Sequence, residues 1–490
     1  MKCTAAVLLL CCVGVSDAYN NGMARTPPMG WQTWCSVGPC GEDHCNDKYI
    51  RDMADTLVST GMQKLGYEWI VLDDCWHPTR DNATGELVAH KQWFPDGMKP
   101  TIDYVHSLKL KFGLYTSVGT ETCHGGWSPG SFGHYTQDAN TFAKWGADYV
   151  KMDYCGSDDS PGGHANFSKA LNATGWPMIF ALCRGPYQSE QKWGYAPKVA
   201  QVWRATGDHH DSFDSVLKEV KAVTGRSTWS SPGNWAYLDM MMTGGQGCKS
   251  QCVGSKDDTG VCNFTEPMHC PGQSDAEYRT EASLYTIVSS PIMVGTDIRL
   301  MTPIMKELLL NPESIAINQD AAAVPGDEMV ACTSAPMPPP PKKCSVQLLK
   351  QISKHKCKLG RSFGCSGNQM TVADGCRGTF TCNGHEISCG KDGNVGHNTC
   401  VCHAGVNATA HAFVRHLSNG NLAVALANVN SSAAEPMSVC LSTVGWKNAG
   451  KPAKVRDVWN KKDLAVLTGD KLTATVGSHD TLLLVFSPAA

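Results

Sequence analysis

The feature that most constrains the fold is an alternation of short β-rich runs with helix-length amphipathic stretches, between about residue 25 and residue 318. The clearest apolar runs cover residues 68–72, 111–115, 147–152, 178–182 and 287–294. Stretches with apolar residues at helical spacing lie between them, for example at residues 47–65. Repeated βα units predict a parallel sheet, and a region of this length suits an α/β fold of the (β/α)8 TIM barrel type.

The composition changes after the barrel. A polyproline tract at residues 336–341 is typical of a stiff spacer, and a dense cysteine segment follows it to about Cys402. That segment holds nine Lys or Arg against three Asp or Glu from residue 342 to residue 402. Alternating strands recur to the end and predict a C-terminal antiparallel β-sandwich. We expect the barrel at 19–325, the sandwich at 326–335 and 411–490, and the spacer with a cysteine-rich insert at 336–410.

The N-terminus predicts a signal peptide at residues 1–18. Lys2 is followed by an apolar core and by small residues at Ser16 and Ala18. Three of the 24 cysteines lie in this leader, which leaves an odd number in the mature chain. So many cysteines indicate an oxidising compartment. Six sequons are compatible with glycosylation, at Asn82, Asn166, Asn172, Asn263, Asn407 and Asn430. The chain is therefore expected to be secreted, or delivered to a lysosome or vacuole.

The net charge of -3 and the lack of another membrane-length apolar run indicate neither nucleic acid nor membrane as a partner. The candidate catalytic residues are instead carboxyl groups at the carboxyl ends of predicted strands, because TIM barrels carry their active sites there. Asp153 closes one apolar run and Asp208 follows another. Retaining glycosidases need two such groups, about 5 to 5.5 Å apart. From the residues alone, two ordinary surface acids are an equally good interpretation.

A resemblance decides between these interpretations. The segment from Arg25 to Trp34 resembles the opening strand of family 27 glycoside hydrolases, the α-galactosidases and α-N-acetylgalactosaminidases. The similarity continues, in order, at residues 71–76, 113–115, 151–153, 203–208, 238–240 and 315–320. It implies a retaining exo-glycosidase that removes terminal α-D-galactosyl residues from oligosaccharides, glycoconjugates or polysaccharides.

The same resemblance implies the roles of individual residues. Asp153 would be the nucleophile, and Asp208 the acid/base. Asp73 and Asp74 would hold the 4- and 6-hydroxyls of the sugar. The remaining contacts would be Trp34 as an apolar platform, Tyr115 and Lys151 lining the site, Arg204 near the 2-hydroxyl, and Asp239 close by. Lys151 would also lower the pKa of Asp153. No metal and no organic cofactor is implied.

The cysteines follow the same family pattern. The resemblance implies a Cys123–Cys155 bridge beside the nucleophile strand. Two further bridges would use Cys35, Cys40, Cys45 and Cys75, in a pairing that sequence leaves open. By the same resemblance Cys183 would be among the substrate-binding residues; it has no evident partner, so it is the candidate for the odd thiol.

The chain departs from the family pattern in three places. Arg184 follows Cys183 where relatives have Glu or Ser, the residues that sort galactose from N-acetylgalactosamine. The Arg184 side chain could narrow the pocket against an acetamide group or bind an acidic group of the substrate. An equally good interpretation is that it points outward. Residues 234–239 also differ from the usual loop, although Asp239 is kept. An apparent insertion at Cys248–Cys270 carries four cysteines, for which disulfides fit an exported chain better than zinc.

Two other functions remain open at this point. One is an α-N-acetylgalactosaminidase, or a hydrolase for another galacto-configured sugar. The other is a carbohydrate-binding pseudoenzyme, although both catalytic aspartates are present. The expected partners are α-galactoside substrates, a second copy of the chain in a homodimer, and a glycan bound by the insert, where residues 347–380 resemble a small lectin-like module.

Overall fold

A computed structural model describes the chain in fourteen stretches. They are residues 21–34, 36, 46–123, 128–157, 162–183, 195–245, 269–329, 332, 345–366, 369–382, 385–389, 398–401, 410–429 and 433–489. The predicted signal peptide, Arg184, Cys35, Cys40 and Cys45 lie outside these residues, as do three of the sequon asparagines (263, 407 and 430).

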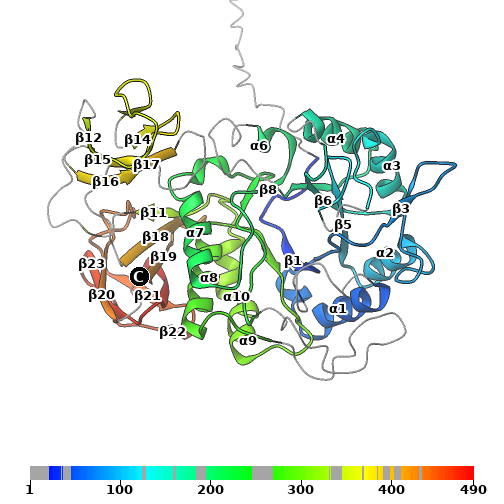
Figure 1. The fold of residues 1–490 in the computed structure, drawn as a ribbon. Coiled ribbons are helices and arrows are strands. Elements are labelled where there is room, and N and C mark those ends of the chain that lie inside the picture. Colours follow the sequence, from blue (N-terminus) through cyan, green and yellow to red (C-terminus); the bar gives the residue numbers. More distant parts are fainter. Residues whose placement is uncertain are drawn as a thin grey trace, which may run out of the picture.

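The larger domain is a barrel of eight parallel strands in the order β10-β1-β2-β5-β6-β7-β8-β9 (Figure 1). The strands are β1 (Met29–Gln32), β2 (Trp69–Val71), β5 (Lys111–Ser117), β6 (Tyr149–Asp153), β7 (Ile179–Leu182), β8 (Val202–Arg204), β9 (Trp235–Tyr237) and β10 (Ile292–Val294). A parallel bridge between Met241, just after β9, and Val294 in β10 closes the ring. The predicted TIM barrel is confirmed.

Close strand packing explains a glycine in the first strand. A Cβ on Gly30 would lie 2.2 Å from the carbonyl oxygen of Trp69 in β2, so no larger residue fits between these strands. A short antiparallel hairpin of β3 (Thr79–Arg80) and β4 (Leu87–Val88) follows β2.

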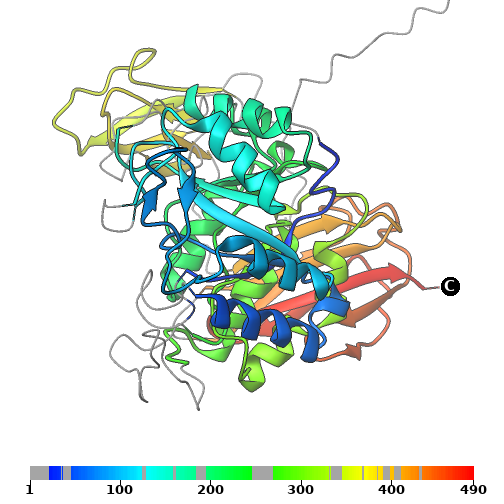
Figure 2. The same cartoon turned by 90° about the vertical axis from the view of Figure 1, so that its right-hand side faces the viewer.

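Helices cover the outside of the barrel, those of the first half on one side (Figure 2). They are α1 (Asp47–Ser59), α2 (Met98–Ser107), α3 (Tyr135–Trp145), α4 (Gly162–Ala173), α6 (Ala196–Val199), α7 (Phe213–Val223), α8 (Asp275–Ile287), α9 (Pro303–Leu309) and α10 (Pro312–Asn318). Their buried apolar residues form one core with the strands, which includes Ile50, Phe112 and Leu284.

Two expected boundaries were wrong. The stretch predicted as a helix at 47–65 is helical only to Ser59 and then forms a 3-10 turn at Gln63–Leu65, because Gly61 takes a left-handed φ of 83°. The run at 287–294 is a strand only from Ile292. Its first residue instead ends α8, a helix started by the capping box of Ser274 and Glu277.

The C-terminal sandwich packs against α8, and this contact joins the two domains (Figures 1 and 2). Its larger sheet has the order β11 (Asp327–Met329), β18 (Ala410–His416), β19 (Leu422–Asn428), β24 (Thr481–Pro488), β21 (Ala453–Asp457), β22 (Lys462–Asp463); the smaller one pairs β20 (Glu435–Cys440) with β23 (Lys471–Val476). Arg279 of α8 forms an ion pair with Asp480 at 3.0 Å. A Cys332–Cys440 disulfide ties the segment after β11 to β20.

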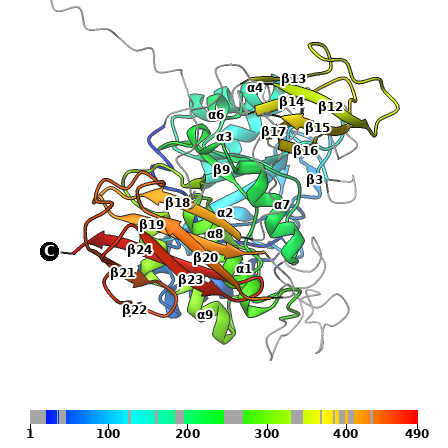
Figure 3. The same ribbon diagram turned by 90° about the vertical axis from the view of Figure 1, so that its left-hand side faces the viewer.

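The pairing of β11 with β18 means that the cysteine-rich insert lies between two neighbouring strands of the sandwich. The insert forms a separate lobe, yellow in Figure 3. It has two three-stranded sheets. The first has the order β12 (Val346–Gln351), β15 (Gly378–Cys382), β16 (His385–Cys389), and the second has the order β13 (Phe363–Ser366), β14 (Gln369–Val372), β17 (Asn398–Val401). A Cys357–Cys376 bridge crosses its small core, as expected for a module too small to be held by apolar burial alone.

Candidate active site

The carboxyl groups singled out in the sequence lie at the carboxyl ends of barrel strands. Asp73 and Asp74 follow β2, and Asp153 is the last residue of β6. Asp208 follows β8, and Asp239 follows β9. Because all eight strands are parallel, these ends meet at one face of the barrel.

A buried ion pair includes Asp73, one of the two aspartates predicted to bind the sugar. Lys151 Nζ donates to Asp73 Oδ2 at 2.6 Å, and the two side chains are 11% and 2% exposed. Gln32 Nε2 donates to the same oxygen, and the backbone N–H of Asp73 donates to Thr33 Oγ1 at 2.9 Å. The Lys151 ammonium also lies 6.0 Å from the Trp34 ring centroid. The direct partner of Lys151 is therefore Asp73 and not Asp153.

The carboxylate of Asp153 accepts two hydrogen bonds from neighbouring groups. Tyr115 Oη donates to Asp153 Oδ2 at 3.0 Å, and the backbone N–H of Tyr154 donates to Oδ1 at 3.1 Å. Burial raises the pKa of Asp153, and the nearby charge of Lys151 lowers it by a smaller amount. Lys151 thus acts in the expected direction, but the pKa of this carboxyl lies above its ordinary value.

Arg204 organises the opposite side of the site. Its guanidinium lies 3.1 Å from Asp208 Oδ1 and 3.0 Å from Asp239 Oδ2, and its Nη1 lies 3.7 Å from Cys183 Sγ. Asp239 has a left-handed φ of 76°, which is rare for a residue other than glycine. The backbone N–H of His209 donates to Asp239 at 2.9 Å, and this bond helps to hold that conformation.

The two predicted catalytic carboxyls differ in exposure and in pKa. The side chain of Asp208 is 80% exposed, whereas Asp153 is half-buried and accepts a hydrogen bond from Tyr115. Desolvation by itself would raise the pKa of Asp208, but the charge and hydrogen bond of Arg204 outweigh this effect and lower it.

The disulfide beside β6 has the pairing that the resemblance implied, Cys123 with Cys155. Cys75 is also disulfide-bonded, and its predicted partners lie outside the described residues. Cys270, in the apparent insertion, is disulfide-bonded too, which favours disulfides over zinc for that cysteine. Within the described stretches, Cys183 is the one free cysteine, and burial raises the pKa of its thiol.

Four supporting residues were missed by sequence reasoning. Gln32 and Thr33 bind Asp73, as described above. His209 Nε2 lies 3.1 Å from Glu281 of α8, which also accepts from the Met242 N–H at 2.8 Å. Gln32 and Thr33 could have been found, because they lie within the motif that ends at Trp34. The pairing of His209 with Glu281 spans 72 positions, and no local pattern signals it.

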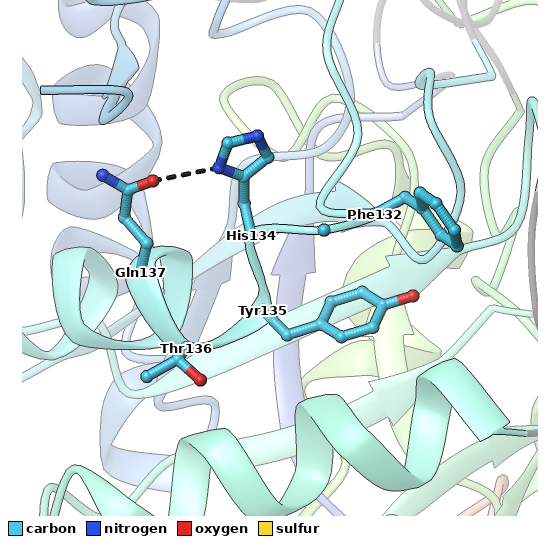
Figure 4. Close-up of a pocket in the computed structure, with 6 residues that line it drawn as sticks. Phe132, His134, Tyr135, Thr136 and Gln137 are labelled. Atoms are coloured by element: carbon cyan, nitrogen blue, oxygen red, sulfur yellow. Dashed lines mark hydrogen bonds between the residues drawn. The ribbon is translucent and has the colours of Figure 1, made fainter. Parts of the chain in front are cut away.

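A surface hollow elsewhere on the barrel is lined by residues 132–137 at the start of α3 (Figure 4). His134 Nδ1 lies 3.0 Å from Gln137 Oε1 there. None of the predicted catalytic or sugar-binding residues lines it, so the hollow is not part of the candidate active site.

A (β/α)8 barrel with paired carboxyls at its strand ends and an appended β-sandwich defines a class, the barrel glycoside hydrolases. A family model described as "Alpha galactosidase A" matches residues 26–256, and one for the "Alpha galactosidase C-terminal beta sandwich domain" matches residues 407–486. A third, described as a protein of unknown function, matches residues 323–417.

Individual relatives agree. The chain is 37% identical over 329 residues to α-galactosidase A of Cellvibrio japonicus, covering 64% of this chain and 73% of the relative. It is 35% identical over 312 residues to the α-galactosidase of Cyamopsis tetragonoloba, covering 63% and 68%. The crystal structure of α-galactosidase I from Mortierella vinacea superposes with a TM-score of 0.67 at 25% identity, covering 96% and 99% of the two chains. The chain belongs to the α-galactosidase family, glycoside hydrolase family 27.

Proposed function

We propose that this protein is a retaining α-galactosidase that removes terminal α-D-galactosyl residues from oligosaccharides, glycoconjugates or polysaccharides. The observation that carries the proposal is the placement of Asp153 and Asp208 at one face of the barrel, in a chain whose relatives are α-galactosidases.

The proposed reaction has two displacements. Asp153 attacks the anomeric carbon from the β face while Asp208 protonates the leaving oxygen, which leaves a β-linked galactosyl ester on Asp153. Asp208 then takes a proton from water, and the water oxygen displaces Asp153. Both carboxyls return to their starting states, and galactose leaves as the α anomer.

The roles require an ionised Asp153 and a protonated Asp208, whereas the pKa directions in the free enzyme run the other way. The competent form is therefore the less populated of the two singly protonated states. A sugar that covers the exposed Asp208 removes water from it and raises its pKa, which shifts the balance toward the competent form. We therefore expect an acidic pH optimum.

Galactose recognition is assigned to the buried aspartate pair. One carboxylate oxygen of Asp73 accepts hydrogen bonds from Lys151 and Gln32. Carboxylates can also accept hydrogen bonds from sugar hydroxyls. Trp34 supplies an apolar face beside them. Arg204 and Asp239 would bind on the 2-hydroxyl side.

A second candidate, an α-N-acetylgalactosaminidase, is favoured by a relative of that name from Gallus gallus at 34% identity over 332 residues. Arg184 stands where relatives have the residue that distinguishes galactose from N-acetylgalactosamine. The two candidate functions differ in whether Arg184 leaves room for an acetamide group at the 2-position of the sugar.

The test compares p-nitrophenyl α-galactoside with its N-acetylgalactosaminide, using the wild-type protein and Asp153→Asn. We expect turnover of the galactoside that vanishes in the variant. Asp153→Ala with added azide should yield the β-galactosyl azide, and Asp208→Ala the α anomer, because azide enters from the side of the missing carboxyl. Preference for the acetamido sugar would select the second candidate. Binding without turnover would select the pseudoenzyme.

We also propose export, a homodimer and a glycan ligand for the insert. The side chains of Asn82, Asn166 and Asn172 are exposed, as glycosylation at a sequon requires. Several disulfides are present, which suits an oxidising compartment. Among the described residues, no helix has the length and apolar character to cross a membrane.

A further inference from the structure

The most unusual charge pattern of the chain lies in the insert and has no part in the proposed reaction. From residue 329 to residue 373 the sequence holds seven Lys or Arg and no Asp or Glu. Five of these cations fall within residues 350–361, the segment named here the basic loop. They are Lys350, Lys354, Lys356, Lys358 and Arg361.

The side chains of all five cations are exposed. None of them forms an ion pair with a residue in the parts of the chain that the structure describes. On the barrel, some exposed lysines do have an acidic partner, as in the Lys48–Asp52 and Lys99–Asp103 pairs, each at 2.6 Å. The basic loop therefore presents its positive charge to solvent without local neutralisation.

The basic loop is held in place by its own contacts. Between the exposed lysines, Ser353 and Cys357 are buried. Ser353 Oγ donates to the His355 carbonyl at 2.7 Å and accepts from the Arg377 N–H at 3.0 Å. Cys357 is bonded to Cys376, and its N–H donates to Gln351 at 3.0 Å. Because the backbone is anchored, a ligand would not have to order it on binding.

The type of ligand follows from what the insert lacks. Its two aromatic residues between residues 342 and 402, Phe363 and Phe380, are both buried. A stacking platform for a neutral sugar is therefore missing, and so are the aromatic anchors common at membrane interfaces. The aliphatic side chains of Leu349, Ile352 and Leu359 are also exposed, and exposed aliphatic residues are common on protein surfaces.

We propose that the basic loop binds an anionic polysaccharide whose charges are sulfate esters. Four of the five cations are lysines, which act as point charges and do not need the planar geometry that arginine matches in carboxylates. Sulfate esters also stay ionised at the acidic pH expected for the enzyme. This inference rests on the proposed glycan ligand of the insert and gives it a chemical class.

The test measures binding of the full-length protein to dextran sulfate, with neutral dextran as a control. Lys354→Glu, Lys356→Glu and Lys358→Glu are combined in one variant. A matched variant carries Lys447→Glu, Lys451→Glu and Lys471→Glu, which change the same charge at exposed lysines of the sandwich. We expect the first variant to bind on the order of 100-fold more weakly and the second to keep most of the affinity. High salt should abolish binding of the wild type.

Equal weakening in the two variants would overturn the site, because only net charge would then matter. Binding to vesicles of anionic phospholipid but not to dextran sulfate would overturn the ligand class. Hydrolysis of p-nitrophenyl α-galactoside, measured in parallel, should be unchanged in both variants, which verifies folding. If no form hydrolyses that substrate, the proposed catalytic function fails, while the binding comparison still decides this proposal.

Discussion

The two sides of the candidate site are built differently. On the side of β2 and β6, Asp73 and Lys151 are buried, Asp153 is half-buried, and all three are bound by neighbouring side chains. On the side of β8, Asp208 is 80% exposed and held by Arg204 alone among the described side chains. A nucleophile and a sugar-hydroxyl site need fixed geometry, whereas an acid/base must exchange protons with water. The difference in exposure is what the proposed roles of Asp153 and Asp208 would require.

The largest expected effect is on the two carboxyls themselves. Asp153→Asn should lower kcat by at least about four orders of magnitude on every substrate, because the covalent step is lost. Asp208→Asn should cost about 10² to 10⁴ on a galactoside with a poor leaving group. Its cost in the first step should be much smaller with p-nitrophenol, which leaves without protonation. Steady-state and burst kinetics on both substrates measure this contrast, and equal losses throughout would contradict the assigned roles.

The next effect concerns the buried ion pair. Lys151→Met leaves the Asp73 carboxylate buried without its cation, and we expect a loss of about 3 to 5 kcal/mol in the free energy of unfolding. Asp208→Asn removes an exposed carboxyl and should change stability by less than about 1 kcal/mol. Urea unfolding of both variants gives the comparison. Similar losses in the two would mean that burial does not distinguish the two sides.

The disulfide provides a third test on the nucleophile side. Cys123 and Cys155 are 32 positions apart, so replacing both by serine should cost about 3 to 4 kcal/mol of stability. Because Cys155 lies two residues after Asp153, kcat should fall as well. Thermal unfolding and the rate on p-nitrophenyl α-galactoside measure the two effects. A stable variant with full activity would show that the bridge does not support the nucleophile.

The smallest effect is a shift in pH dependence. Because the competent form is the less populated singly protonated state, the alkaline limb of kcat/KM should report the pKa of Asp153, which burial raises above the ordinary carboxyl range. The acid limb should report the pKa of Asp208, which Arg204 lowers. Arg204→Gln should therefore move the acid limb to higher pH, and Arg204→Lys, which keeps the cation, should move it less. An unchanged limb in Arg204→Gln would assign that titration to another group.

Much of the architecture could be predicted from local patterns. The apolar runs of β2, β5, β6 and β7 and the alternating strands of the sandwich were readable, because each carries its own periodicity. The end of α1 and the start of β10 were not, because Gly61 interrupts a longer apolar pattern and α8 runs on to Ile287, into the apolar run that was taken for a strand. The position of the insert within the sandwich depended on a short strand, β11, whose partner lies far along the chain.

The sequence by itself determined which carboxyls stand at strand ends, because motif order and strand periodicity are local properties of the chain. Only the tertiary structure decided what each of them contacts. It paired Lys151 with Asp73 across 78 positions and placed Asp239 against Arg204. It also set the pKa of Asp153 by burial, and that of Asp208 by Arg204 at an exposed position. The contacts of these side chains, their burial and the electrostatic effect of neighbouring charges depend on distances between strands that are far apart in sequence. The closure of the barrel sets those distances.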